Sequence, residues 1–143
     1  MSERVKMLYL CNHNANRSQM AEGWTNHIRG QEFMAFSAGV EPTALDPRTV
    51  RVMGEEGVDL GGHRSKNIDE VGEKEFDYVV TLCAGAAENC PYFPAKTRVV
   101  HRSFDDPTVL AAREATEERK LAAYRRVRDE IKAFVEGLPD SLG

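Results

Sequence analysis

The stretch VKMLYLCNHNANRSQM, residues 5–20, decides the fold of this chain. Residues 5–10 are an apolar run typical of a buried strand, and the run stops at Cys11. A polar, asparagine-rich loop follows, and from Arg17 the apolar residues are spaced as in a helix. We expect one face of that helix to carry Met20, Trp24, His27 and Ile28. The stretch therefore predicts a strand, a tight loop and a helix in direct succession.

Further strands and helices alternate along the rest of the chain. Strands are predicted at residues 33–38, ending at Gly39, at residues 76–82, running into Cys83, and at residues 98–101. Helices are predicted from Asp46-Pro47 to about residue 56, briefly at residues 68–71, and at residues 114–138. The last helix carries an apolar stripe of core residues: Leu121, Tyr124, Val127, Ile131, Phe134, Val135 and Leu138.

This alternation predicts an α/β fold, a three-layer α/β/α sandwich around a four-stranded parallel sheet. We see no repeat or linker, so residues 1–143 are expected to form a single domain. In such sheets ligands bind beyond the carboxyl ends of the strands. Cys11 and Cys83 each follow a strand directly, so both should lie on that rim.

Composition excludes several classes of protein. The formal net charge of −4 over 143 residues argues against nucleic-acid binding, which needs a basic surface. The start of the chain does not resemble a signal peptide, and no stretch approaches the roughly 20 apolar residues of a membrane helix. The expected compartment is the cytoplasm, where static disulfides are rare, so the three cysteines predict reactive thiols or metal ligands.

Cys11 opens a loop suited to a tetrahedral oxyanion. Five residues separate Cys11 from Arg17, and Ser18 follows. Between a strand and a helix, the backbone N–H groups of such a loop can surround an anion, and the helix N-terminus adds positive potential. Arg17 can bind two anion oxygens at once, and the same field favours the thiolate of Cys11, to which Ser18 can donate. The intervening residues are Asn12, His13, Asn14, Ala15 and Asn16; His13 is a weak candidate for a base.

A candidate general acid follows the fourth strand. The segment Phe104-Asp105-Asp106-Pro107 places two carboxylates near the same rim. Pro107 restricts Asp106 to extended conformations that can aim its side chain. An Asp-Pro turn is the commoner meaning of this dipeptide, and only the nearby anion loop favours the catalytic interpretation.

Cys83 and Cys90 form a second candidate pair. In a helix they would share a face about 10.5 Å apart at 1.5 Å per residue. A disulfide needs Cα atoms within roughly 7 Å, so this segment would have to unwind before the pair could bond. The rival interpretation is a zinc site completed by His63 or His101, but three thiols without a C-x2-C pair match such sites poorly.

Together these residues resemble the thioredoxin-coupled arsenate reductases, which share the fold of the low-molecular-weight protein tyrosine phosphatases. The resemblance covers nearly the whole chain: the loop with its continuation SQMAEGW, the segment FSAG at residues 36–39, VVTLC at residues 79–83, FDDP, and RVRDEIK in the last helix. The phosphatases share the loop alone. The pair Cys83 and Cys90 is the feature specific to the arsenate reductases.

The resemblance implies a three-thiol relay that detoxifies arsenic. Cys11 attacks arsenate held by the loop and Arg17, while Asp106 protonates the departing hydroxyl. Cys83 then attacks Cys11 and arsenite leaves, and Cys90 resolves the resulting disulfide. Thioredoxin, recycled by thioredoxin reductase, would be the external reductant of a monomer without a bound cofactor.

One departure from the family concerns a cation site. Some members bind potassium near the loop, and Asn14, Glu22 and Ser37 match three of those ligands. The fourth ligand is an aspartate in those proteins and corresponds to Lys66 here. Our hypothesis is that Lys66 reaches Glu22 and replaces the charge of the metal, so that no metal is bound; the alternative is a solvated surface lysine. Asn16 also stands where some members have another cysteine.

Two alternative functions remain. A phosphatase of this fold acting on phosphotyrosine places aromatics after the Asp-Pro to hold the substrate ring, whereas this chain continues Thr108-Val109-Leu110. The other is a non-catalytic oxyanion or redox sensor, whose biological output would survive replacement of Cys11 by serine.

Overall fold

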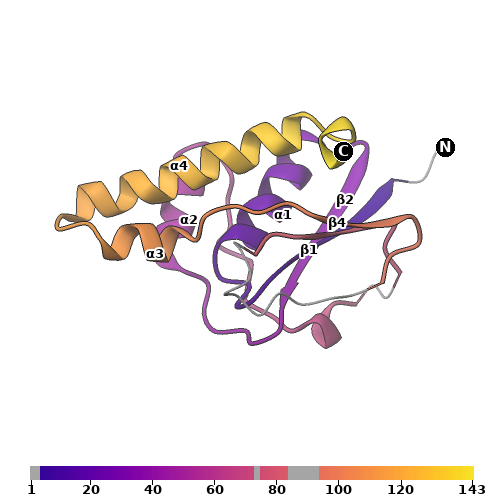
Figure 1. Cartoon of the computed structure of the whole chain (residues 1–143), viewed down its shortest axis with the longest axis horizontal. Coiled ribbons are helices and arrows are strands. Elements are labelled where there is room, and N and C mark those ends of the chain that lie inside the picture. The colour runs from indigo at the N-terminus through magenta and orange to yellow at the C-terminus, as the bar shows by residue number, and fades with distance from the viewer. Residues whose placement is uncertain (1–3, 73–74, 84–93) are drawn as a thin grey trace.

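The computed structural model describes residues 4–72, 75–83 and 94–143. Its centre is one sheet of four parallel strands in the order β2-β1-β3-β4 (Figure 1). The strands are β1 (Val5–Cys11), β2 (Phe33–Gly39), β3 (Tyr78–Thr81) and β4 (Arg98–His101). This pairing confirms the predicted α/β class and parallel sheet.

The strand order places a topological switch point between β1 and β3. The chain leaves β1 for β2 on one side and later returns to β3 on the other. Leu10 pairs with Thr81, and the amide of Leu82 donates to the carbonyl of Leu10 at 2.9 Å. Cys11 and Cys83 therefore leave the same rim of the sheet, where open α/β sheets bind ligands.

A layer of helices covers one face of the sheet. It consists of α1 (Arg17–Ile28), α2 (Pro47–Gly54), α3 (Pro107–Ala112) and α4 (Glu117–Glu136), and Figure 1 shows α4 extending along this layer. All seven residues of the predicted α4 stripe are buried, and they share one core cluster with Met7, Tyr9 and Val80 of the sheet. This stripe is confirmed as core packing.

A thinner layer covers the opposite face. Leu8, Leu10 and Val79 project into a second cluster, which Val71 and Phe76 close. The short 3-10 helix η1 (Ile68–Glu70) lies in this layer, and a last 3-10 turn, η2 (Asp140–Leu142), ends the chain. The three layers agree with the predicted sandwich.

Three details of the sequence interpretation were wrong. Met20 and Trp24 are buried, but His27 and Ile28 are exposed, because the buried part of α1 ends at Thr25 and its last three residues extend into solvent. β3 is shorter than the expected residues 76–82. The last helix begins at Glu117 rather than at residue 114, because the side chain of Thr116 caps it by accepting from the amide of Arg119.

The helix α3 was not anticipated. Asp106 is its N-cap and Pro107 its first residue, the same arrangement that Asp46 and Pro47 provide for α2. An aspartate before proline caps a helix well, because the carboxylate accepts from a free amide and proline needs no donor. None of the helices formed by the described residues combines the length and apolar character needed to span a bilayer.

Candidate active site

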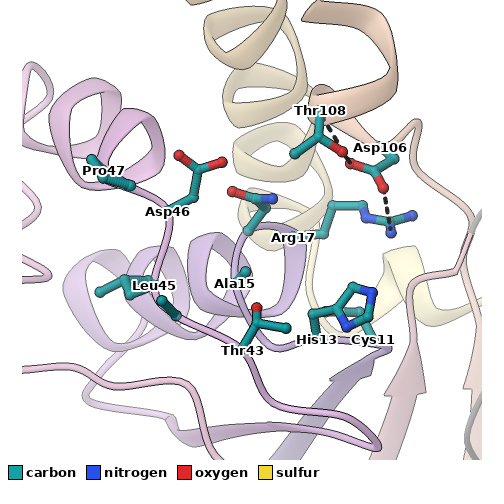
Figure 2. Close-up of a pocket in the computed structure, with 12 residues that line it drawn as sticks. Cys11, His13, Ala15, Arg17, Thr43, Leu45, Asp46, Pro47, Asp106 and Thr108 are labelled. Atoms are coloured by element: carbon teal, nitrogen blue, oxygen red, sulfur yellow. Dashed lines mark hydrogen bonds and ion pairs between the residues drawn. The ribbon is translucent and has the colours of Figure 1, made fainter. Parts of the chain in front are cut away.

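A cavity of about 320 Å³ lies at the carboxyl end of β1. The loop after β1 forms its floor, the chain entering α2 forms one wall, and the start of α3 forms the other (Figure 2). Its lining residues are Cys11, His13, Ala15, Asn16, Arg17, Thr43, Ala44, Leu45, Asp46, Pro47, Asp106 and Thr108. The cavity thus brings the predicted nucleophile, arginine and acid together at one place.

Cys11 lies buried on the floor of the cavity with a defined hydrogen-bond partner. Its Sγ is 2.9 Å from Oγ of Ser18, and Nδ2 of Asn14 donates to the same Oγ at 2.8 Å. Because Ser18 already accepts from Asn14, its own proton is available to the sulfur. A hydroxyl that donates to sulfur favours the thiolate, which is the reactive form.

Asn14 holds the loop in its curved shape. It is fully buried with φ of 52°, a left-handed conformation that asparagine tolerates better than most residues. Gln19 donates to its carbonyl at 3.2 Å and to its Oδ1 at 3.0 Å, and the amide of Lys66 also donates to Oδ1 at 3.0 Å. The loop is therefore fixed before any ligand arrives.

Arg17 reaches from α1 across the ends of the neighbouring strands. Its Nη1 donates to the carbonyl of Phe104 at 3.1 Å and to that of Leu82 at 3.4 Å. Its Nη2 lies 3.6 Å from Oδ2 of Asp106 (Figure 2). Two backbone carbonyls and the carboxylate of Asp106 thus hold the guanidinium of Arg17 in the wall of the cavity.

Only one of the two adjacent aspartates faces the cavity. Oδ1 of Asp106 accepts from the amide of Thr108 at 2.9 Å and from its hydroxyl at 2.7 Å, which leaves Oδ2 toward Arg17. Its backbone is extended, with φ −76° and ψ 116°, as Pro107 predicts. Asp105 instead pairs with Arg126 at 2.9 Å on the surface.

Cys83 is buried two residues beyond β3, and its carbonyl accepts from Oγ of Ser103 at 3.0 Å. The β1–β3 pairing places it beside the end of β1, on the same rim as Cys11. Cys90 lies outside the described residues. The structure therefore locates two of the three thiols of the predicted relay.

The remaining loop residues bind the segment that enters α2, and of these His13 and Ala15 line the cavity. His13 is exposed, and its Nδ1 lies 2.9 Å from the carbonyl of Glu41, which can only accept. That nitrogen therefore donates to the backbone. The carbonyl of Asn12 accepts from the amide of Glu41 at 2.9 Å, and that of Ala15 from the amide of Asp46 at 3.3 Å. These bonds join the loop to the segment that enters α2.

Behind the loop, Glu22 is the centre of a polar cluster. Oγ of Ser37 donates to its Oε1 at 2.5 Å, and Nζ of Lys66 lies 3.7 Å from the same oxygen. Nδ1 of His63 lies 3.5 Å from its Oε2 and 3.0 Å from Oε1 of Gln19. An ammonium group in this position does not suit a potassium ion. Among the described residues, no group of three or more His, Cys, Asp or Glu side chains is placed to hold a metal.

Several residues of the site escaped the sequence analysis. Gln19 and the wall formed by residues 43–47 were not singled out. Thr108 was noted only because it is not aromatic, and His63 only as a possible zinc ligand, rather than as partners of Asp106 and Glu22. The repeated Asp-Pro dipeptide at Asp46 and Asp106 was a usable signal, since both begin a helix beside the cavity.

Comparison with known proteins places the chain in a family. The low molecular weight phosphotyrosine protein phosphatase family matches residues 6–143. An arsenate reductase of Halalkalibacterium halodurans is 44% identical over 140 residues, covering 95% of this chain and 98% of that protein. One of Bacillus subtilis is 45% identical over 129 residues, covering 90% and 91%.

Solved structures agree with this assignment. The arsenate reductase from Archaeoglobus fulgidus superimposes with a TM-score of 0.66 at 30% identity, covering 91% of this chain and 98% of that one. The resemblance inferred from the residues is confirmed. The chain belongs to the low molecular weight phosphotyrosine protein phosphatase family, in the branch of the proteins named arsenate reductase.

Proposed function

We propose that this chain reduces arsenate to arsenite by a relay of three thiols. The observation that carries the proposal is the shared cavity of Cys11, Arg17 and Asp106, with Cys83 on the same rim. Relatives above 40% identity over most of their length are named arsenate reductases, which supports arsenate as the substrate. The relay needs its thiols in the reduced state, which the cytoplasm maintains, so we place the protein there and assign it a role in arsenic detoxification.

The first step forms a bond between sulfur and arsenic. The thiolate of Cys11 attacks arsenate held by the loop amides and Arg17, the bond from arsenic to one hydroxyl group breaks, and this hydroxyl takes up one proton and leaves as water. The proton comes from Oδ2 of Asp106, because Oδ1 is occupied by two donors from Thr108. Ser18 stabilises the thiolate before the attack.

The next steps move two electrons to arsenic. Cys83 attacks the sulfur of Cys11, the S–As bond breaks with its electron pair on arsenic, and arsenite departs. Cys90 then attacks Cys83, which frees Cys11 and leaves a disulfide between Cys83 and Cys90. Thioredoxin reduces this disulfide by thiol–disulfide exchange and is itself recycled by thioredoxin reductase, so the reaction requires no bound cofactor.

The cavity does not favour phosphotyrosine. A flat ring needs aromatic neighbours to stack on, and no Phe, Tyr or Trp belongs to the described lining of this cavity. Thr108 occupies the position after Pro107 and binds Asp106 instead of presenting a ring. An aryl phosphatase is therefore the weaker candidate.

The decisive measurement is arsenate-dependent oxidation of NADPH with thioredoxin and thioredoxin reductase, without glutathione. We expect steady turnover for the native chain, one equivalent of arsenite per chain for Cys90→Ser, and none for Cys11→Ser. Hydrolysis of an aryl phosphate without arsenate turnover would overturn the proposal and identify a phosphatase with two idle cysteines.

A further inference from the structure

Asn16 is the N-cap of α1, yet within the described part of the chain its side chain makes no capping hydrogen bond. The helix itself begins normally, since the carbonyl of Asn16 accepts from the amide of Met20 at 2.9 Å. Asparagine at this position ordinarily accepts from an amide of the first turn. In this chain α1 begins with Arg17, which lines the cavity, and a helix N-terminus that binds an oxyanion must offer its first-turn amides to the ligand.

The side chain of Asn16 is held elsewhere. Its carboxamide lies 2.5 Å from Oγ1 of Thr49 on α2, and both residues are buried. The amide orientation that satisfies its surroundings directs the nitrogen at Oγ1 of Thr49 (2.5 Å), Oδ2 of Asp46 (3.1 Å) and the carbonyl of Ala15 (3.2 Å). Three acceptors thus hold this group away from the helix axis.

Asp46 is in turn fixed by two elements. Its Oδ1 caps α2 by accepting from the amide of Arg48 at 2.9 Å, and its Oδ2 accepts from the hydroxyl of Tyr124 on α4 at 2.5 Å. Burial and the adjacent carboxylate both raise the pKa of Tyr124, so its hydroxyl remains a donor at neutral pH. The network therefore extends from the loop through α2 to α4.

We propose that Thr49 and Asp46, the latter oriented by Tyr124, are positioning residues that keep the Asn16 side chain from capping α1. This inference rests on the proposed function, because it concerns the binding of the oxyanion by the same loop. A freed Asn16 would accept from the first-turn amides and compete with the substrate inside the molecule. The diversion leaves the N-terminus of α1 open for the anion.

The test compares the binding of inorganic phosphate, measured by calorimetry, across a small set of variants. Thr49→Val removes the hydroxyl and should weaken binding about fivefold, because a capping bond is worth about 1 kcal/mol and 1.4 kcal/mol equals tenfold. Thr49→Ser keeps the hydroxyl and should bind as the native chain does. The double variant Asn16→Ala/Thr49→Val should recover binding to within about twofold, because the competing side chain is gone.

Recovery in the double variant separates this role from a structural one, since a merely loosened loop would not be repaired by a second truncation. Unchanged binding in Thr49→Val, or a loss that Asn16→Ala does not reverse, would overturn the inference. If Thr49→Val fails to fold, Tyr124→Phe removes only the hydroxyl that orients Asp46. Tyr124→Phe should weaken phosphate binding about twofold, and adding Asn16→Ala should restore it. Unchanged binding, or a loss that Asn16→Ala does not restore, would overturn the inference.

Arsenate turnover tests the proposed reaction, and phosphate binding tests the role of Thr49, so the two claims can be disproved separately. A native chain that binds phosphate but does not turn over arsenate with thioredoxin would disprove the proposed reaction, while the variant series would still decide the role of Thr49. A native chain that binds neither phosphate nor arsenate would overturn both.

Discussion

At the scale of single residues, the contact between Ser18 and the sulfur of Cys11 bears most directly on reactivity. The hydroxyl lies 2.9 Å from Sγ, and Asn14 orients it by donating to its oxygen. A hydrogen bond to a charged group is worth roughly 1.5 kcal/mol or more. Loss of this bond should therefore slow every reaction that begins with the thiolate.

We expect Ser18→Ala to slow alkylation of Cys11 by iodoacetamide at pH 7 about tenfold, because a contribution of roughly 1.5 kcal/mol is lost. Mass spectrometry of the modified peptide provides the rate. Ser141→Ala is the matched control, since its hydroxyl binds the carbonyl of Phe134 near the chain end. Equal rates for Ser18→Ala and the native chain would show that this hydroxyl does not support the thiolate.

Lys66 is the second residue whose role depends on one contact. Its Nζ lies 3.7 Å from Oε1 of Glu22, and the two side chains are only 17% and 14% exposed. We retain the hypothesis that this ammonium replaces a potassium ion. The native chain should then melt at the same temperature in potassium chloride and in choline chloride.

For Lys66→Met we expect stability to fall by about 1–2 kcal/mol, because Glu22 loses a partner while remaining largely buried. Potassium should restore part of this loss. Thermal melting at constant ionic strength measures both effects, and Lys96→Met, which removes a surface lysine that is 60% exposed, is the control. Stabilisation of the native chain by potassium would contradict the hypothesis.

At the scale of elements, the end of β2 supports the anion loop by close backbone contact. A Cβ on Gly39 would lie 2.6 Å from the carbonyl oxygen of Asn12 and 2.8 Å from the amide nitrogen of Asn14. Both are backbone atoms of the loop, which cannot move aside without changing its shape. The absence of a side chain at Gly39 therefore lets β2 and the loop pack together.

Gly39→Ala should lower the free energy of unfolding by about 1–3 kcal/mol through overpacking and weaken phosphate binding more than tenfold. Urea denaturation and calorimetry measure the two effects. Gly62→Ala is a matched control, because nothing lies within 4 Å of the added carbon. Native affinity in Gly39→Ala would show that the loop tolerates displacement.

Some helices and strands could be predicted from the sequence and others could not. The parallel strands and the α4 stripe were predicted because apolar spacing directly reflects which side chains are buried. The six-residue helix α3 was missed because so short a helix has little periodic signal, and Asp106-Pro107 also suits a turn.

At the scale of the whole molecule, we propose that the chain forms one domain, because both core clusters lie against the same sheet. An ionic contact joins α2 to α4 at the edge of this core. Glu55 accepts from Arg125 at 2.8 and 2.9 Å and from Arg128 at 3.0 Å. Hydrogen bonds from Arg125, followed by those from Arg128, lower the pKa of Glu55 to about 2.

This shift defines a pH window. The pKa of Glu55 is depressed in the folded state from an ordinary value of 4.5. The ion pairs of Glu55 therefore contribute fully to the free energy of unfolding above pH 4.5, and this contribution is lost as the pH falls toward 2. Because Glu55 is 32% exposed, solvent screening limits the contribution to about 1 kcal/mol.

Glu55→Gln should therefore be about 1 kcal/mol less stable than the native chain at pH 7, and the difference should shrink by pH 3. Urea denaturation at both pH values checks this. Glu75→Gln alters a carboxylate that is 73% exposed and should change stability little at pH 7. A difference that stays constant from pH 7 to pH 3 would exclude the ionic origin.

The sequence by itself determined the order strand, loop, helix and the residues that the loop carries. Cys11, Arg17 and Ser18 are close in the chain, so the geometry of a strand end and a helix start brings them together whatever the rest of the fold does. The same local reasoning placed Cys83 on the rim, since parallel strands end at one edge.

Only the tertiary structure decided which distant groups meet at the loop. Asp106, rather than Asp105, faces Arg17, and Asn16 reaches Thr49 rather than its own helix. These choices depend on how helices dock on the sheet and on strand register, which arise from the summed packing of the core. Local spacing has no record of such contacts, because each joins residues that are far apart in the chain.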